Sequence, residues 1–187
     1  MGSLGVMFGI ILIIVLIASF VVRIYNGLIK LRIRSEEAWS DINTQLKRRY
    51  DLIPNLVESV KGYAKHERGT FEEVTKARAA AMSATAVGDK AQAENFLTSA
   101  LKSLFAVAEN YPELKANENF LQLQSTLTDV EDKLQLSRRY YNAVVRDLNT
   151  KISMFPSNIV ANMFSFTAKA FFELGSEEEG KNVKVSF

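Results

Sequence analysis

Few residues in this chain could do chemistry. His66 is the only histidine among the 187 residues, and there is no cysteine. The lack of cysteine excludes disulfides, thiolate metal sites and a cysteine nucleophile, and one histidine supplies too few of the ligands that zinc prefers. Because Lys65 and Glu67 flank it, we interpret His66 as a solvated residue near a helix end. We therefore expect no catalytic residue, no metal and no cofactor.

Carboxylates also fail to form an obvious acid–base pair. Glu36 and Glu37 are adjacent, as are Glu72 and Glu73. Neighbouring residues on a helix point in different directions, so such pairs do not converge on one site. We interpret them as solvated helix faces, and the chain is not predicted to be an enzyme.

Three polar residues stand on otherwise apolar helical stripes, namely Arg49, Ser137 and Lys151. One interpretation is a buried polar site inside a helical bundle that binds a small anion or a lipid head group. The interpretation we favour is that Arg49 pairs with a carboxylate of a facing helix and helps to fix the helix register, at some cost in stability. The sequence offers three carboxylates as examples: Asp129, Asp132 and Asp147.

The first 22 residues have the composition of a membrane span. They contain no charged side chain, and residues 4–22 are rich in Ile, Leu, Val and Phe. This matches the ~20 apolar residues that cross a bilayer. A cleaved signal peptide would need a basic beginning and a small-residue cleavage site, and both features are missing. We predict an uncleaved transmembrane anchor over residues 1–24.

Basic residues follow this span and predict its orientation. Arg23, Lys30, Arg32 and Arg34 come with no acidic residue among them. By the positive-inside rule the N-terminus lies outside and the domain in the cytoplasm, which gives a single-pass membrane protein. Within the span, Gly5 and Gly9 are four residues apart, a spacing that lets two helices approach closely and is one interpretation in support of a homo-oligomer. The alternative is that glycine is simply common in transmembrane helices.

The rest of the chain shows helical periodicity. A stripe of seven-residue spacing runs through Trp39, Leu46, Ile53 and Val60, and it resumes in phase after Pro54, so a kink is expected there and not a break. Two shorter helices follow, the first with Thr70 as N-cap. A seam of alternating three- and four-residue steps then predicts a long helix over about residues 116–154. Its positions are Phe120, Leu123, Leu127, Val130, Leu134, Ser137, Tyr141, Val144, Leu148, Lys151 and Phe155.

These patterns predict an all-α fold, with the anchor followed by an antiparallel bundle of three to five long helices. We assign residues 25–35 to a helical connector, 36–174 to the bundle and 175–187 to a disordered tail. A short last helix is expected from Ile159 to Leu174. It carries more aromatic side chains than one core stripe needs, so some should be exposed as oligomer or membrane contacts. They are Phe164, Phe166, Phe171 and Phe172.

Several local motifs carry a family resemblance over about residues 25–174. The longest is the run Gln45-Leu46-Lys47-Arg48-Arg49-Tyr50-Asp51-Leu52-Ile53-Pro54-Asn55-Leu56-Val57, and others include Tyr111-Pro112-Glu113-Leu114-Lys115 and Phe155-Pro156-Ser157-Asn158-Ile159. The chain resembles the LemA family of bacterial membrane proteins. The resemblance implies an N-terminal anchor, a helical bundle, N-out topology and no established reaction, with a membrane protease or other envelope protein as partner. One departure is the stretch after Phe164-Ser165-Phe166, where relatives carry Phe-Gly-Phe followed by a more basic, proline-containing segment.

Charge and motifs together lead to a functional hypothesis. The formal net charge of +2 is too small for a nucleic-acid-binding surface. We expect a membrane-anchored helical scaffold or adaptor that works through protein contacts, self-assembly included. The alternative is a receptor-like binder of a small anionic ligand or lipid head group, with Arg49 in its pocket.

Overall fold

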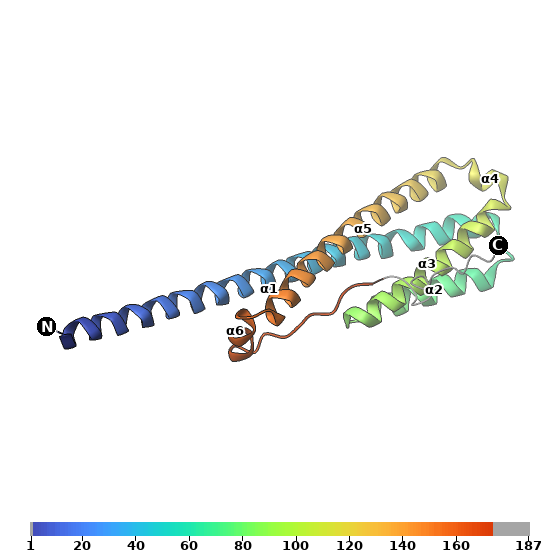
Figure 1. The fold of residues 1–187 in the computed structure, drawn as a ribbon. Coiled ribbons are helices and arrows are strands. Elements are labelled where there is room, and N and C mark those ends of the chain that lie inside the picture. Colours follow the sequence, from blue (N-terminus) through green and yellow to red (C-terminus); the bar gives the residue numbers. More distant parts are fainter. Residues whose placement is uncertain (1, 174–187) are drawn as a thin grey trace, which may run out of the picture. The chain divides into compact units, whose positions relative to one another are not determined.

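The computed structural model of the chain describes residues 2–173, and its helices follow one another without any strand in that range (Figure 1). Helix α1 (Gly2–Tyr63) is followed by α2 (Arg68–Ser83), α3 (Val87–Glu109), α4 (Pro112–Lys115), α5 (Glu118–Ser153) and α6 (Ser157–Met163). The predicted all-helical fold with a long apolar N-terminal helix is therefore confirmed. The predicted tail, 175–187, lies outside the described residues.

Helix α1 joins the apolar segment to the rest of the chain without interruption over 62 residues. It continues through Pro54, whose side chain is exposed, and ends at Tyr63. The predicted stripe is buried at Leu46, Ile53 and Val60, each at most 1% exposed.

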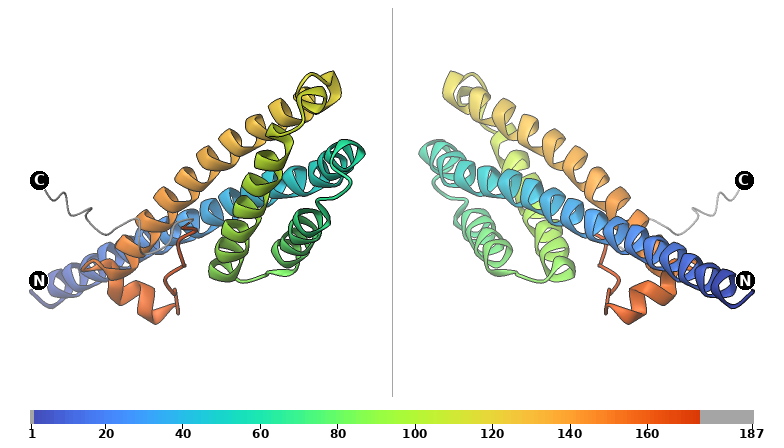
Figure 2. Two further views of the ribbon diagram at one scale, coloured as in Figure 1. Left: turned by 90° about the vertical axis from the view of Figure 1, so that its right-hand side faces the viewer. Right: turned by 90° about the vertical axis from the view of Figure 1, so that its left-hand side faces the viewer.

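Helices α2 and α3 form a hairpin and lie side by side in both Figures 1 and 2. Helix α2 buries Phe71, Val74 and Ala81, and α3 buries a longer stripe that includes Leu97, Leu101 and Leu104. The predicted cap at Thr70 is wrong. The cap position is Glu67, three residues earlier, and its side chain makes no capping hydrogen bond.

The predicted long helix is α5, and most of its seam is buried. Phe120, Leu127, Val130, Leu134, Tyr141, Val144 and Leu148 are all below 9% exposed. Phe155 was predicted to continue this seam, but it is 79% exposed. Because α5 ends at Ser153, the helical period no longer decides where Phe155 points.

The predicted last helix is wrong beyond its first turns. Helix α6 ends at Met163, and the described residues after Phe164 are not helical. Ser165 has φ 56°, the Ser165 N–H donates to the Asn162 carbonyl at 3.2 Å, and the Phe166 N–H donates to the Ala161 carbonyl at 2.9 Å. These two bonds around a left-handed residue form a Schellman motif, which terminates the helix.

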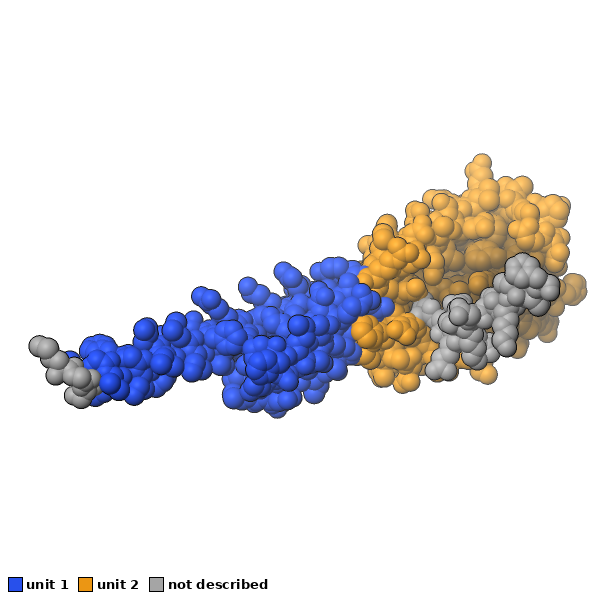
Figure 3. Space-filling model, viewed as in Figure 1, with its two compact units in different colours: residues 1–39, 140–169 blue, residues 40–139, 170–187 orange. Residues whose placement is uncertain are grey.

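The chain divides into two compact units, shown in Figure 3. Unit 1 comprises Met1–Trp39 and Tyr140–Lys169, and unit 2 comprises Ser40–Arg139 and Ala170–Phe187. Helices α1 and α5 contribute to both units. In unit 1, Leu28 of α1 and Leu148 of α5 form a core cluster with Val160 and Ala161 of α6.

Candidate functional site

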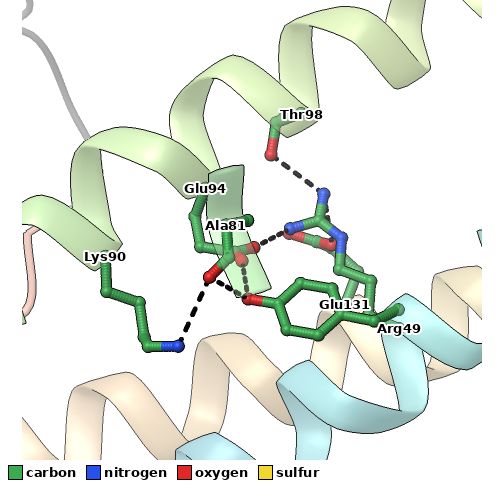
Figure 4. Close-up of polar contacts among 7 residues, drawn as sticks. Arg49, Ala81, Lys90, Glu94, Thr98 and Glu131 are labelled. Atoms are coloured by element: carbon green, nitrogen blue, oxygen red, sulfur yellow. Dashed lines mark hydrogen bonds and ion pairs between the residues drawn. The ribbon is translucent and has the colours of Figure 1, made fainter. Parts of the chain in front are cut away.

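The most prominent polar feature of unit 2 is a buried network centred on Arg49. Arg49 and Tyr50 are consecutive residues of α1 and lie about 100° apart around its axis, but both side chains reach Glu94 of α3. Glu94 and Thr98 are four residues apart on α3 and therefore lie one above the other, facing Arg49 (Figure 4). Glu131 comes from α5. Three helices thus contribute charged or polar groups to one place.

The guanidinium of Arg49 is held by three acceptors. Its Nη1 donates to Glu94 Oε2 at 2.7 Å, and its Nη2 donates to Thr98 Oγ1 at 2.9 Å (Figure 4). Glu131 Oε2 forms a further ion pair with Nη2 at 3.3 Å. Arg49 is 2% exposed and Glu94 0%, whereas the Glu131 side chain is 42% exposed. Arg49 and Glu94 therefore form a buried salt bridge, and the partly exposed Glu131 is a third charged partner.

Tyr50 connects this pair to α2. Its hydroxyl donates to Glu94 Oε1, and the Ala81 carbonyl lies 3.3 Å from the same hydroxyl. The Nζ of Lys90 donates to that carbonyl at 3.4 Å, and the Nε of Arg78 donates to the Tyr50 carbonyl at 2.8 Å. The network therefore cross-links α1, α2, α3 and α5.

Burial shifts the proton affinities of two groups around the network. Desolvation, together with the hydrogen bond to Glu94, raises the pKa of Tyr50 above its ordinary value. Burial lowers the pKa of Arg138, although Glu131 opposes the shift. Both shifts disfavour the charged form of the side chain, as expected where burial removes part of its hydration.

Two polar atoms near the network have no hydrogen-bond partner: Nε of Arg49 and Oε1 of Gln45, one turn earlier on α1. A groove of about 380 Å³ opens beside Arg49. Its wall includes Arg49, Thr98 and Glu131 of the network, and it is completed by Leu101, Lys102, Phe105, Gln124, Leu127, Thr128 and Asp132. The groove therefore presents apolar side chains together with charges of both signs.

The sequence of the chain was compared with those of known protein families. A family model described as the LemA family matches residues 38–187. The chain belongs to the LemA family. Protein LemA of Metamycoplasma hominis is 29% identical over 166 residues, which cover 86% of this chain and 74% of the relative.

Further relatives of this LemA-family chain carry magnetosome names. Magnetosome protein MamQ 2 of Paramagnetospirillum magneticum is 22% identical, with 86% of this chain and 68% of the relative covered. Magnetosome protein MamQ of Magnetospirillum gryphiswaldense is 21% identical, with 79% and 64% covered. None of these names is that of an enzyme.

The N-terminal part of this LemA-family chain contains one helical segment that is long and apolar enough to cross a membrane, and it lies within α1. Its most apolar 18-residue window has a mean hydropathy of 3.0, and none of that window is buried. An unburied segment of this composition needs an apolar environment outside the chain. Together with the family match, this supports a membrane-associated helical protein.

The predicted buried polar site is distributed over the two units. Arg49 is buried and Ser137 is half-buried in unit 2. Lys151 belongs to unit 1, where it is half-buried and its Nζ stands where a Cβ on Gly27 would lie.

The prediction that Arg49 pairs with a carboxylate is confirmed, but the partners suggested from the sequence are not those observed. Glu94 and Glu131 pair with Arg49, instead of Asp129, Asp132 or Asp147. Glu94 was missed. The sequence feature that could have indicated Glu94 is a carboxylate on the apolar stripe of α3, between Ala91 and Leu97.

The predicted oligomer contacts occupy different environments. A Cβ added at Gly5 or Gly9 would meet no atom of the residues that the structure describes within 4 Å. Phe164 and Phe171 are 48% and 38% exposed, while Phe172 is buried. Phe166 is half-buried, with its ring centroid 5.9 Å from that of Tyr25. Self-association through these residues stays a prediction.

His66 is exposed, as interpreted from the sequence. In the part of the chain that the structure describes, no group of three or more His, Asp or Glu side chains is placed to hold a metal ion.

Proposed function

We propose that this LemA-family chain is a membrane-anchored scaffold or adaptor that acts through protein–protein contacts, self-association included, and has no catalytic activity. The observation that carries the proposal is the buried ionic network of unit 2. Arg49 is matched by Glu94 and Glu131, and these side chains join α1, α3 and α5. Charges used in this way hold a bundle in register and are not poised to react with a substrate.

Self-association is supported by the bare surface at Gly5 and Gly9. Both lie in the candidate membrane span, and no described residue occupies the space beside them. Small residues four apart let a second helix approach until the backbones pack closely. The proposed partners are therefore a second copy of this chain and a further envelope protein, such as a membrane protease.

The first experiment is to extract the full chain gently from its native membrane and to measure the particle mass together with any co-purifying protein. A discrete multiple of the 21.0 kDa chain supports self-assembly. A single chain with a stoichiometric foreign protein supports the adaptor role and identifies its partner. A single chain without any partner overturns both.

A pair of variants assigns the assembly to the span. Gly5→Leu/Gly9→Leu should lower the particle mass, because the added side chains keep two helices apart. The matched control is Met7→Leu/Ile11→Leu, which alters the opposite face of the same helix. Equal masses for both variants would contradict a role for the glycine pair.

The proposed location is a bacterial inner membrane, crossed once, with the N-terminus outside and the bundle in the cytoplasm. The support is the run of basic residues after the span: Arg23, Lys30, Arg32 and Arg34.

A second candidate function is the binding of a small anion or lipid head group. The specific observation is that the groove opens onto Arg49, whose Nε is buried without a partner. Phosphate and glycerol phosphate should then raise the melting temperature of the full chain in a saturable way. Arg49→Met/Glu94→Leu removes both buried charges together and should abolish the response, whereas Lys61→Met, at an exposed site, should keep it. No saturable response of the unaltered protein would rule this function out.

A further inference from the structure

A second apolar surface lies outside the α1 span, at the turn from α5 into α6. We call residues 154–164 the α5–α6 tip. Its exposed large hydrophobic side chains are Met154 (58%), Phe155 (79%), Ile159 (55%), Met163 (67%) and Phe164 (48%). Such a concentration of exposed apolar side chains usually marks a surface that is covered by a partner or a membrane.

The sequence around the tip carries no charge. Between Lys151 and Lys169 there is no Asp, Glu, Lys or Arg. A solvated loop of this length ordinarily contains charged residues, and a surface that enters lipid avoids them, because a charge in hydrocarbon is costly. The composition of the tip therefore resembles that of a membrane-contacting segment.

The tip belongs to unit 1, beside the end of the apolar run of α1 (Figure 1). Val160 and Ala161 of α6 form a core with Leu28, and Val21 and Ile24 of α1 pack against this core. The ring of Phe164 also lies 4.7 Å from that of Tyr25, centroid to centroid. Val21 is one residue before the end of the uncharged run.

The length of that run places its end at the edge of the bilayer. Residues 4–22 in a helix span about 28 Å at 1.5 Å per residue, close to the ~30 Å of hydrocarbon. Arg23 is the first charged residue and is exposed. Because α6 packs beside Val21, Ile24 and Tyr25, the tip lies within about two helical turns of the hydrocarbon boundary.

Cationic residues flank the tip in the sequence, and others lie on α1 in the same unit. The guanidinium carbon of Arg32 is 5.7 Å from the ring centroid of Phe166. Lys151 and Lys169 flank the uncharged stretch, and Lys30 and Arg34 follow on α1. Aromatic side chains bordered by cations suit the region of anionic lipid head groups.

We propose that the α5–α6 tip inserts into the head-group and upper acyl region of the bilayer, beside the end of α1, as a second membrane contact of the chain. The inference rests on the α1 anchor and not on the assembly proposed above. Lipid is the occupant that the structure favours, because the tip is continuous with the segment that must already lie in the membrane. A second copy of the chain covering the tip is the competing outcome.

The test uses the natural absence of cysteine, which allows one nitroxide label at a time. Phe155→Cys and Met163→Cys place the label on the tip. Leu12→Cys is the control inside the span, and Leu136→Cys, at an exposed apolar residue of α5, is the control in water. Each labelled full-length protein is reconstituted at one chain per nanodisc, in phosphatidylethanolamine with phosphatidylglycerol. Collisions of the label with oxygen, which concentrates in lipid, are compared with those of a water-soluble nickel complex.

The expected result is that labels at Phe155 and Met163 are severalfold more accessible to oxygen relative to nickel than the label at Leu136, and follow Leu12. Nickel accessibility equal to that of Leu136 overturns the proposal. Protection that appears only when several chains share one nanodisc also overturns it, in favour of a second copy. A water-accessible label at Leu12 overturns both the anchor and the tip contact. If the chain does not self-associate but the labels at Phe155 and Met163 still favour oxygen over nickel, the inference stands.

Discussion

At the scale of single residues, the pairing of Glu94 with Arg49 should dominate the stability of unit 2. Glu94→Gln leaves the guanidinium buried with only the partly exposed Glu131 as a charged partner. Removing one member of a buried pair costs about 3 kcal/mol, because the other charge remains desolvated. We expect the free energy of unfolding to fall by roughly that amount, measured by denaturant unfolding in detergent with circular dichroism.

The control for this prediction is Glu58→Gln. Glu58 pairs with Lys61 at 3.0 Å, but both side chains are more than half exposed. An exposed pair contributes less than about 1 kcal/mol, so the variant should unfold almost like the unaltered protein. Equal effects of the two variants would show that the Arg49 network adds nothing beyond a surface ion pair.

Tyr50 should give unfolding a pH dependence in alkali. Burial and the hydrogen bond to Glu94 raise the pKa of the Tyr50 hydroxyl in the folded state. In the unfolded chain this hydroxyl ionises at about pH 10. Below that pH both states hold the proton, and above it only the folded state does. The free energy of unfolding therefore decreases as the pH rises above about 10.

Tyr50→Phe should make this decrease shallower between about pH 9 and 11, measured by denaturant unfolding at each pH. It should not abolish the decrease, because burial also raises the pKa of Tyr141. Tyr140→Phe changes a side chain that is 53% exposed and is the control. A slope that is the same in all three proteins would contradict the assignment.

The sequence indicated a buried Arg49 but not its partner. A charged residue on an apolar stripe must be buried or must break the stripe, so its burial follows from periodicity. The partner depends on which helix faces meet, and periodicity does not specify this. Glu94 lies on α3, and only the packed helices show that it faces Arg49.

At the scale of elements, α1 and α5 could be predicted because each carries an apolar stripe over many turns, which an irregular chain would not maintain. The end of α6 could not. The spacing of Ile159, Val160, Met163 and Phe164 continues in helical steps to Phe171. However, Ser165 takes the left-handed position that glycine usually marks, so the usual stop signal is missing.

This position leads to a prediction of increased stability. A side chain in the left-handed region costs about 1–2 kcal/mol that glycine avoids, and the greater freedom of glycine in the unfolded chain offsets part of the gain. Ser165→Gly should therefore raise the free energy of unfolding by about 0.5–1 kcal/mol in denaturant titrations. Ser103→Gly, at an exposed position inside α3, should lower it. A decrease at both positions would mean that Ser165 does not restrain the chain in this way.

At the scale of the whole molecule, the charge after the span should decide which side of the membrane holds the bundle. Arg23, Lys30, Arg32 and Arg34 lie within the first turns after the apolar run, where basic residues have most influence on orientation. The only cysteine of a Lys61→Cys variant reports the side of the bundle, since Lys61 is exposed at 55% and stands near the end of α1.

In intact spheroplasts we expect Lys61→Cys to be protected from a membrane-impermeant maleimide and to react after permeabilisation. Replacing the four basic residues with asparagine in the same variant should let a fraction of the molecules react in intact spheroplasts. The reason is that the positive charge that keeps this side of the span in the cytoplasm has been removed. Replacing four exposed basic residues that lie far from the span, Lys76, Lys102, Lys115 and Lys133, with asparagine gives the same net charge as the asparagine variant and should leave the cysteine protected. Full reaction of the original variant in intact spheroplasts would instead place the bundle outside, and any cytoplasmic partner would then be excluded.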